Sequence, residues 1–483
     1  MTKINQYIYL CTKFAKINWM LDQSTICAIS TPPGIGGIAV IRLSGKEAIP
    51  IADKIYQSPA NIKRLADQKA NTLHFGVIKS GDELIDEVVV SLFKTPHSFT
   101  GEDIVEISCH GSVYIQQMIL QLLISKGARL ARPGEFTQRA FLNGKMDLSQ
   151  AEAVADLIAS GNAAAHKLAI SQMRGGFSRE IHQLRAELLR FAALVELELD
   201  FSEEDIEFAD RRALIELSTR IATLLKKLTE SFRLGNVIKN GIPVAIIGET
   251  NVGKSTLLNA LLNEDKAIVS DIHGTTRDVI EDVVNIGGTL FRFSDTAGIR
   301  ETTDVIETIG IERSYNQLDK SEIVLLVTDI SGSVQPILDR IVKIRKKIGD
   351  QQLIIIANKV DIASAESQNQ LSKFPLLPNE TLVFIAAKSR ANLDELIQQM
   401  KRAVDFDSIG PEEVIVSNVR HYEALSMAYG AIEKVIEGLK TGISGDFLAQ
   451  DIRECLHYLG EITGEVSTDE ILGHIFKHFC IGK

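Results

Sequence analysis

The chain has 483 residues, too many for one ordinary domain, and its content of 45% hydrophobic and 24% charged residues indicates folded cores rather than disorder. The net charge of −11 weighs against a protein that coats nucleic acid by bulk electrostatics, because that mode needs a cationic surface. The five cysteines include no C-x-x-C pair, which favours a reducing compartment over a disulfide framework or a zinc site. No apolar run is long enough to span a membrane, so we expect a cytoplasmic protein.

Residues 1–21 form an N-terminal extension. Lys and Asn interrupt each of its apolar runs, whereas a secretory signal needs an uninterrupted apolar segment and a transit peptide is richer in Arg and Ser. The alternative is that translation starts at Met20.

Residues 22–143 have the pattern of an α+β domain. Short apolar runs predict strands at Ile26–Ile29, Ile38–Leu43, Val88–Phe93 and Ile104–Ile107, and one longer run predicts a helix at Ile115–Leu123. Two of these strands carry Arg42 and Glu106. Each either holds a polar ligand or is an ordinary ion-paired residue of the sheet, because sequence alone cannot show that the two converge. The glycine-rich turn at residues 31–37 is either a ligand turn or a packing turn, because no Lys-Ser follows it.

Residues 144–238 and 406–483 have a helical pattern. Apolar residues recur there at steps of three or four, as in Leu184, Leu188, Ala192, Val195 and Leu199. Such stripes predict the seams of a helix bundle. Because the two segments flank an α/β segment at residues 239–405, we predict one discontinuous helical domain with a separate domain inserted into it.

The inserted segment begins with a phosphate-binding pattern. The apolar run Val244–Ile247 predicts a buried strand, Gly248–Ser255 matches G-x-x-x-x-G-K-S, and the following residues predict a helix. In this context Lys254 is expected to reach the outer phosphates of a nucleotide, and Ser255 is expected to bind magnesium. The other predicted contacts of this P-loop are Asn251, Val252, Gly253 and Thr256.

Further motifs follow in the order that a GTPase of the Ras-like type requires. A polar loop supplies Thr276 to complete the magnesium shell, and a strand ends in an Asp-Thr-Ala-Gly whose glycine senses the γ-phosphate. The predicted nucleotide contacts of these two segments are Ser270, Asp271, Ile272, His273, Gly274, Thr275 and Thr276, and then Asp295, Thr296, Ala297 and Gly298. The ordered set of motifs predicts GTP binding.

Two later motifs select the base. In the first, Asn358, Lys359 and Asp361, the carboxylate of Asp361 can accept two hydrogen bonds from guanine, and adenine offers no such pair of donors. In the second, Ala386, Ala387 and Lys388, the serine of the usual Ser-Ala-Lys is absent, so the Ala387 amide is the expected contact.

Hydrolysis needs a group that the motifs above do not supply. Ile299 stands where small signalling GTPases place a water-orienting glutamine, and no arginine finger is identifiable. The nearby acidic candidates are Glu301, Asp304 and Glu307, each of which can instead be solvated surface.

Three less common motifs carry a resemblance to one family. They are Ser98–Asp103 followed by Glu106 and Cys109-His110-Gly111, then Pro133–Lys145, and the terminal Phe479–Lys483. From Thr25 to Lys483 the chain resembles the MnmE (TrmE) family of tRNA-modification GTPases. The resemblance implies an N-terminal folate-binding domain, a helical domain and an inserted GTPase domain in a homodimer.

The same resemblance implies a reaction and its partners. The homodimer would form a heterotetramer with the FAD-containing partner MnmG (GidA), with no membrane involved. Together they would install a (carboxymethyl)aminomethyl group at C5 of the wobble uridine of certain tRNAs. The one-carbon unit would come from a tetrahydrofolate derivative, either 5,10-methylene- or 5-formyl-tetrahydrofolate.

Residue roles also follow from the resemblance. The implied catalytic residues are Lys254, Glu307 and Cys480. Glu307 matches the family's water-activating glutamate. For Cys480 the alternative is a small buried hydrophobic residue. Implied folate contacts are Arg42, Glu106, Lys145 and Lys483. Potassium, which would supply the charge of the missing arginine finger, would be held by Asn251, Ser270, Ile272 and Thr275.

Two other functional classes remain open. A ribosome-assembly or translation GTPase would share the GTPase motifs but should carry a basic or aromatic RNA-binding appendage, whereas the flanking helices are acidic. A folate-dependent methyltransferase acting alone would need its own flavin site, and no G-x-G-x-x-G follows a predicted strand. The lysine-rich run Lys343–Lys347 either touches RNA or is a solvated helix face, which is the usual fate of such runs.

Overall fold

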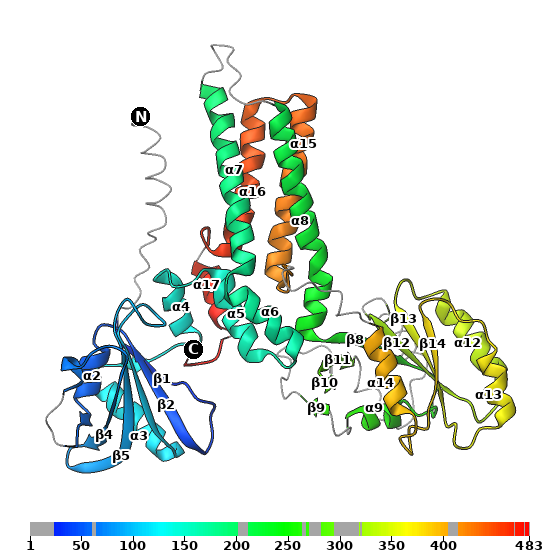
Figure 1. Cartoon of the computed structure of the whole chain (residues 1–483), viewed down its shortest axis with the longest axis horizontal. Helices are drawn as coiled ribbons and strands as arrows, with labels where there is room; N and C mark the ends of the chain where they lie inside the picture. The colour runs from blue at the N-terminus through cyan, green and yellow to red at the C-terminus, as the bar shows by residue number, and fades with distance from the viewer. Residues whose placement is uncertain are drawn as a thin grey trace. The chain divides into compact units, whose positions relative to one another are not determined.

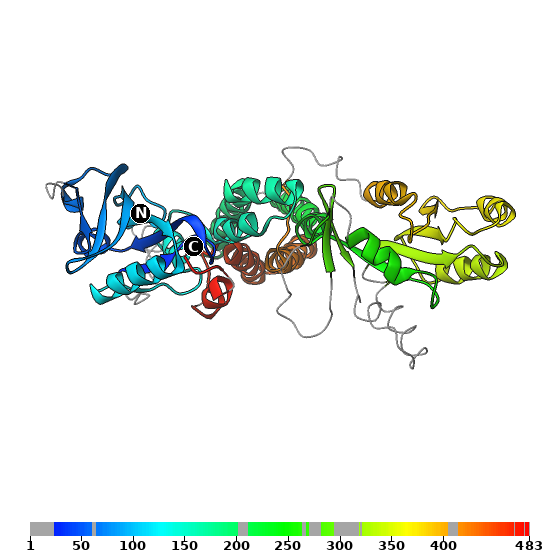
Figure 2. The same cartoon turned by 90° about the horizontal axis from the view of Figure 1, so that it is seen from below.

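The computed structural model describes residues 24–59, 64–200, 211–262, 267–269, 282–293, 318, 321–403, 414–467, 469–477 and 479–482. Figure 1 shows the chain, and Figure 2 shows it turned by 90°. The chain divides into two compact units. The first comprises Met1–Ile158, Ile170–Leu225 and Ala424–Lys483, and the second comprises Ala159–Ala169 and Lys226–Glu423.

The first unit contains a seven-stranded sheet in the order β3-β4-β5-β6-β2-β1-β7. Its strands are β1 (Ile26–Ile29), β2 (Gly36–Ser44), β3 (Tyr56–Gln57), β4 (Thr72–Ser80), β5 (Glu83–Phe93), β6 (Ile104–Gly111) and β7 (Arg129–Leu130). Only the β1–β7 pair of this sheet, as described, is parallel. The antiparallel register of β2 and β6 places Arg42 directly opposite Glu106.

The two faces of this sheet differ. One face is covered by α2 (Ala48–Asp53) and α3 (Val113–Ser125), and alternate strand residues such as Ile41, Val90 and Ile107 are fully buried beneath them. Because strand side chains alternate between faces, the intervening residues Arg42 and Glu106 lie on the opposite face. This second face, which we call the open face, also carries exposed apolar side chains on β4.

Long helices form the remainder of the first unit. The described helices are α4 (Glu135–Leu142), α5 (Leu148–Ala159), α6 (Ala163–Met173), α7 (Gly176–Asp200), α8 (Arg211–Asn240), α15 (Val419–Thr441), α16 (Gly445–Thr463) and α17 (Asp469–Lys477), of which α5, α6, α8 and α15 continue into the second unit. Within the first unit, α7 packs along α16 beside α8 and α15 (Figure 1). The predicted seam residues Leu184, Leu188 and Val195 are buried there, which confirms the helical stripes.

The second unit contains a sheet in the order β14-β13-β12-β8-β11-β10-β9. Its strands are β8 (Ile242–Ile247), β9 (Ala267–Val269), β10 (Asp282–Ile286), β11 (Thr289–Phe293), β12 (Ile323–Asp329), β13 (Gln352–Asn358) and β14 (Glu380–Phe384). The strands β11, β8, β12, β13 and β14 are parallel to one another. Their carboxyl ends therefore meet at one edge of the sheet, where ligands bind in α/β folds.

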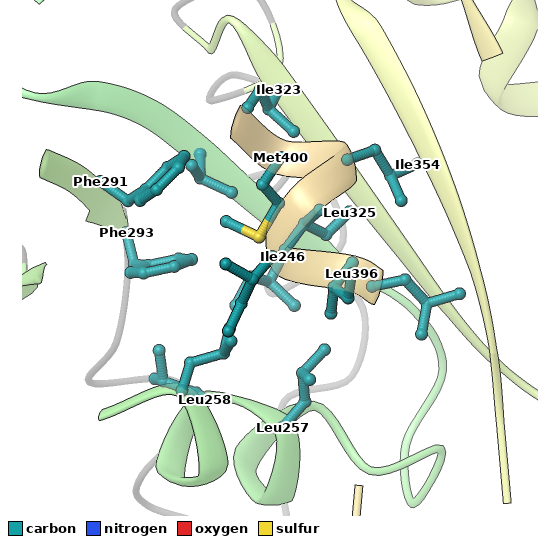
Figure 3. Close-up of a cluster of buried hydrophobic side chains, with 14 of the residues drawn as sticks. Ile246, Leu257, Leu258, Phe291, Phe293, Ile323, Leu325, Ile354, Leu396 and Met400 are labelled. Carbon is teal, nitrogen blue, oxygen red and sulfur yellow. The ribbon is translucent and has the colours of Figure 1, made fainter. Parts of the chain in front are cut away.

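Helices cover both faces of this second sheet. On one face, Leu257 of α9 (Lys254–Leu262) and Met400 of α14 (Leu393–Arg402) pack against Ile246 and Leu325, as Figure 3 shows. On the other face, α12 (Gln335–Arg345) and α13 (Ala365–Ser372) cover the cluster that includes Ile247. Such double burial explains why these strands have continuous apolar runs.

The strand and helix predictions agree with these elements where they were made. The predicted strands at residues 26–29, 38–43, 88–93 and 104–107 lie within β1, β2, β5 and β6, and the predicted helix lies within α3. The elements that the sequence analysis does not predict include β4, β12, α2, α13 and α14, and of α12 it predicts only a helix face around Lys343. None of the described helices contains a stretch long and apolar enough to cross a membrane.

Within the second unit, helix α8 lies very close to the backbone of Val416 at Gly235. A Cβ atom at Gly235 of α8 would lie 2.0 Å from the carbonyl oxygen of Val416. Alanine favours a helix over glycine by about 1 kcal/mol, but the clash with backbone outweighs this gain, so we expect Gly235→Ala to lower the free energy of unfolding. Gly430→Ala in α15, where nothing lies within 4 Å of the added Cβ, is the matched control and should raise stability by about 1 kcal/mol. Denaturant unfolding followed by circular dichroism would measure both changes; a stabilised Gly235→Ala variant would contradict the close approach.

Candidate functional site

The P-loop lies between β8 and α9, as the sequence predicts. Gly248 and Gly253 both have positive φ angles, of 156° and 102°. A Cβ at Gly248 would lie 2.3 Å from the Val327 carbonyl oxygen, and one at Gly253 would lie 2.3 Å from Nδ2 of Asn358. Glycine is therefore required at both positions by backbone angle and by space.

Lys254 carries the charge of this loop. Its Nζ donates to the carbonyl oxygens of Gly248 and Glu249, at 2.7 Å each. Burial lowers the pKa of Lys254, and no carboxylate of the described chain pairs with it. A desolvated ammonium group whose partners are neutral carbonyls is suited to bind an anion such as a polyphosphate.

Asn358 at the end of β13 joins three loops of the site. Its side-chain Nδ2 donates to the Val252 carbonyl at 2.8 Å, and its Oδ1 accepts from the Ala387 backbone N–H at 3.0 Å. Asn358 is buried, so loss of its side chain would leave polar backbone groups unpaired. The Ala387 amide, which the sequence predicts to contact the base, donates to Asn358 in this structure.

Lys359 and Asp361 follow Asn358 at the same edge of the sheet. Nζ of Lys359 contacts Oδ2 of Asp329 at 2.5 Å, and Asp361 is exposed. Burial tends to raise the pKa of Asp329, but hydrogen bonds from Lys359 and Ser331 outweigh it and hold the pKa below its usual value. Sequence reasoning missed Asp329, although its place at the end of the buried run of β12 was a usable signal.

A second missed feature is an ion pair behind the P-loop. Arg340 of α12 pairs with the carboxylate of Glu249, the residue that follows Gly248. Burial lowers the pKa of Arg340. The pair neutralises a carboxylate within the same loop as Lys254.

Several predicted contacts lie outside the described residues. They are Ser270, Asp271, Ile272, His273, Gly274, Thr275 and Thr276, then Asp295, Thr296, Ala297 and Gly298, and also Glu307 and Lys483. Of the predicted GTP contacts, the structure places the P-loop residues and those of the two base motifs at one edge of the second sheet. Among the described residues there is no group of three or more His, Cys, Asp or Glu suited to hold a metal ion.

A second candidate site lies on the open face of the first sheet. Arg42 contacts Oε1 of Glu106 at 2.8 Å, and the two side chains are 21% and 25% exposed. The rings of Phe99 and Phe136 each lie 5.7 Å from the guanidinium carbon of Arg42. The two predicted residues therefore converge as an ion pair that stays accessible to a ligand. Lys145 donates from Nζ to the Pro96 carbonyl at 2.9 Å.

The C-terminal segment docks on the same unit. The Gly134 N–H donates to the Cys480 carbonyl at 3.4 Å, and Oγ of Ser30 donates to the Gly482 carbonyl at 3.0 Å. Cys480 itself is exposed and free, so its alternative interpretation as a small buried hydrophobe is wrong.

The exposure of side chains bears on two further sequence interpretations. The turn at residues 31–37 is largely exposed, with Ile35 at 92%, so it is not a packing turn within this chain. In the lysine-rich run, Lys343, Lys346 and Lys347 are exposed while Arg345 pairs with Glu380, which agrees with a solvated helix face.

Comparisons with known proteins agree with this architecture. Residues 25–145 match the family model described as the GTP-binding protein TrmE N-terminus, and residues 148–480 match the MnmE helical domain. A protein of Bacteroides thetaiotaomicron named tRNA modification GTPase MnmE is 58% identical over 96% of this chain and 100% of its own length. A protein of the same name from Flavobacterium johnsoniae is 54% identical over 96% of this chain and 100% of its own length. A crystal structure of Aquifex aeolicus Era bound to GDP.AlF4- is 30% identical and covers 39% of this chain and 66% of that chain, with a TM-score of 0.26.

The ion pair behind the P-loop predicts a charge effect on nucleotide affinity. Arg340→Gln would leave the Glu249 carboxylate unneutralised beside the phosphates, so we expect it to weaken GTP binding by a few-fold and GDP binding by less. Glu249→Gln in the same background should restore both affinities, because it removes the repelling charge. Fluorescence titration with labelled nucleotides would measure the four variants of the cycle. Equal losses for GTP and GDP without rescue would show that Arg340 acts only by packing.

Proposed function

Because the chain belongs to the MnmE (TrmE) family of tRNA modification GTPases, we propose that it hydrolyses GTP and uses the hydrolysis in modifying tRNA. The observation that carries the proposal is the P-loop, in which half-buried Lys254 has only carbonyl partners among the described residues. The family match extends over both the GTPase motifs and the two flanking segments.

In this proposal each residue of the nucleotide site has its own role. Lys254 would bind the outer phosphates, and Asp361 would accept hydrogen bonds from the guanine edge. Asn358 positions both regions, because it joins the P-loop to the segment after β14. Lys359 is held by Asp329 and would lie along the base.

Two metal ions belong to the proposal. Magnesium would be held by Ser255 and Thr276, and potassium by Asn251, Ser270, Ile272 and Thr275. Asn251 has a φ of 62°, a left-handed conformation that asparagine tolerates, so its place in the tight loop fits such a role. Both cations would offset negative charge on the phosphates during hydrolysis, and Glu307 would orient the attacking water. A comparison of turnover rates in potassium and sodium salts tests the potassium site.

The proposed domain division follows the family match. An N-terminal tetrahydrofolate-binding and dimerisation domain would comprise residues 22–143, after an extension at 1–21. The helical domain would comprise 144–238 and 406–483, and the GTPase domain 239–405. Arg42, Glu106, Lys145 and Lys483 would bind a tetrahydrofolate derivative as the one-carbon donor, and the exposed Cys480 would act near it.

The proposed reaction is the modification of the wobble uridine at C5 with a (carboxymethyl)aminomethyl group. It would need the FAD-dependent partner MnmG (GidA) in a heterotetramer, with tRNA as the substrate in the cytoplasm. In this proposal the FAD of that partner would carry out the redox step.

A homodimer is also part of the proposal, and the open face of the first sheet supports it. Leu73 and Phe75 of β4 are 71% and 55% exposed, and Ile38 of β2 is 70% exposed. Strand alternation places these side chains away from the core beneath α2 and α3. An apolar surface of this kind typically marks an interface with another protein.

The first experiment is mass spectrometry of tRNA nucleosides from cells with and without the gene. We expect the modified wobble uridine to disappear without the gene and to return with the wild type but not with Lys254→Ala, because the variant lacks the phosphate-binding cation. Thr256→Ser, which keeps the hydroxyl group next to the same loop, is a control that should restore the nucleoside. Unchanged nucleosides in the deletion strain would favour the alternative of a ribosome-assembly GTPase.

Sedimentation analysis tests the homodimer. Phe75→Glu places a charge on the exposed apolar strip and should convert dimer to monomer at micromolar concentration, because burying an unpaired charge is costly. Lys343→Glu, on the solvated face of α12, should leave the dimer intact. A Phe75→Glu protein that remains dimeric would place the interface elsewhere.

A further inference from the structure

A network of charged side chains lies beside the Arg42–Glu106 pair; Glu135 and Arg139 are buried, while Glu102 and Arg129 are 26% and 27% exposed. Its centre is Arg139 of α4, whose side chain is only 2% exposed. NH1 of Arg139 contacts both carboxylate oxygens of Glu102, at 3.2 and 3.1 Å, and NH2 contacts Oε1 of Glu135 at 3.0 Å. Arg129 of β7 completes the network through two bonds of 2.8 and 2.6 Å to Glu135.

The network is balanced and strongly bonded. It contains two arginines and two glutamates, and the Arg132 backbone N–H also donates to Glu135. Burial tends to raise the pKa of Glu135, but hydrogen bonds from Arg129, Arg132 and Arg139 outweigh it and lower the pKa. Desolvating such charges is expensive, and apolar residues of similar volume often stabilise a core equally well. The network is therefore poorly explained by stability alone.

The network is bonded to the loop that carries Phe99. Oγ of Ser44 donates to Oε2 of Glu102 at 2.7 Å and lies 2.7 Å from Oγ1 of Thr100. Asn143, just after α4, donates to the Thr100 carbonyl at 2.7 Å. The loop at residues 95–102 is thus fixed between the end of β2 and α4.

Both aromatic neighbours of Arg42 are held by the same network. Phe99 precedes Glu102 by three residues, and Phe136 stands on α4 between Glu135 and Arg139. The two rings are equally distant from the guanidinium group of Arg42, which pairs with Glu106. Any shift of Glu102 relative to Arg139 would therefore move Phe99 against Arg42.

We propose that the Arg129–Glu135–Arg139–Glu102 network positions the Phe99 loop over Arg42 and so sets the affinity of the Arg42–Glu106 site for its planar heterocyclic ligand. Glu102, Glu135 and Arg139 are positioning residues in this account, since none of them needs to touch the ligand. The inference rests on the proposed folate function for the identity of that ligand.

The experiment compares Glu102→Gln with wild type in the full-length protein. The variant keeps the shape of the side chain but removes the charge that faces Arg139. The amides of residues 95–102 should then exchange hydrogen about ten-fold faster, while those of β2 and β6 stay protected. The dissociation constant for 5-formyl-tetrahydrofolate, measured by calorimetry, should rise about ten-fold, and GTP turnover should not change.

Two further variants keep the test decisive. Ser44→Ala removes one hydrogen bond to Glu102 without changing the charge of the network, so it should cause the same changes in exchange and affinity at smaller size. It replaces Glu102→Gln in the test if that variant folds poorly. Asp53→Asn is the matched control: Asp53 accepts from the Leu65 and Ala66 N–H groups elsewhere in the same unit, and its change should affect neither readout.

The outcomes separate the two hypotheses. Unchanged exchange at residues 95–102 in folded Glu102→Gln and Ser44→Ala proteins would overturn the positioning role. Faster exchange with an unchanged folate affinity would overturn it as well. Wild-type protein that does not bind the folate would reject the proposed folate function, and the exchange rates would still decide whether the network holds the loop.

Discussion

The nucleotide site depends on the two hydrogen bonds of Asn358. Parallel strands bring the P-loop, the Asn358 segment and the Ala387 segment to one edge of the sheet, but adjacency alone leaves their loops free to shift. Asn358 connects the P-loop to the Ala387 segment, because its Nδ2 donates to the Val252 carbonyl and its Oδ1 accepts from the Ala387 N–H. The close approach of Nδ2 to Gly253 also excludes a side chain at that glycine. The phosphate-binding and base-binding parts are thereby held at a fixed separation.

Buried polar groups with satisfied hydrogen bonds hold both candidate sites in position. In the second unit a buried neutral amide is satisfied by backbone groups, and in the first unit buried charges satisfy one another. Both arrangements are costly when one partner is removed, because an unpaired buried polar group loses its solvation without compensation. By contrast, exposed pairs such as Lys226 with Glu230 are worth about 0 to 1 kcal/mol at most. Positional precision in this chain thus comes from its buried polar groups.

The sequence predicts the P-loop and its strand and helix because short-range signals define them. The G-x-x-x-x-G-K-S spacing, the apolar run of β8 and the start of α9 are all contiguous, and the structure places them as expected. The pairing of Arg42 with Glu106 could not be predicted, because it depends on the register between β2 and β6, which are 64 positions apart at these residues. The ion pair between Glu249 and Arg340 could not be predicted either, because the two residues are far apart in the sequence and meet only in the folded chain.

The environments of Ala387 and Cys480 were hidden from the sequence for a common physical reason. Motif position alone predicts that the Ala387 amide contacts the base, whereas the acceptor on Asn358 becomes visible only when β13 and β14 are adjacent. Cys480 was considered as a buried hydrophobe because cysteine is commonly buried, yet the segment docks through its backbone carbonyls and leaves the thiol in solvent. In both cases the decisive hydrogen bond joins segments that are far apart in the sequence, so local sequence does not specify it.

The acidic composition is compatible with a polyanionic ligand because the nucleotide site depends on local groups. A net charge of −11 opposes binding through a broad surface, where many exposed cations must act together. A P-loop instead uses backbone N–H groups and a single desolvated lysine, whose field is poorly screened by solvent. The carboxylate within this loop, Glu249, is paired with Arg340 and does not oppose that field. Local pairing of charge, rather than the net charge of the chain, therefore determines whether the site can accept phosphate.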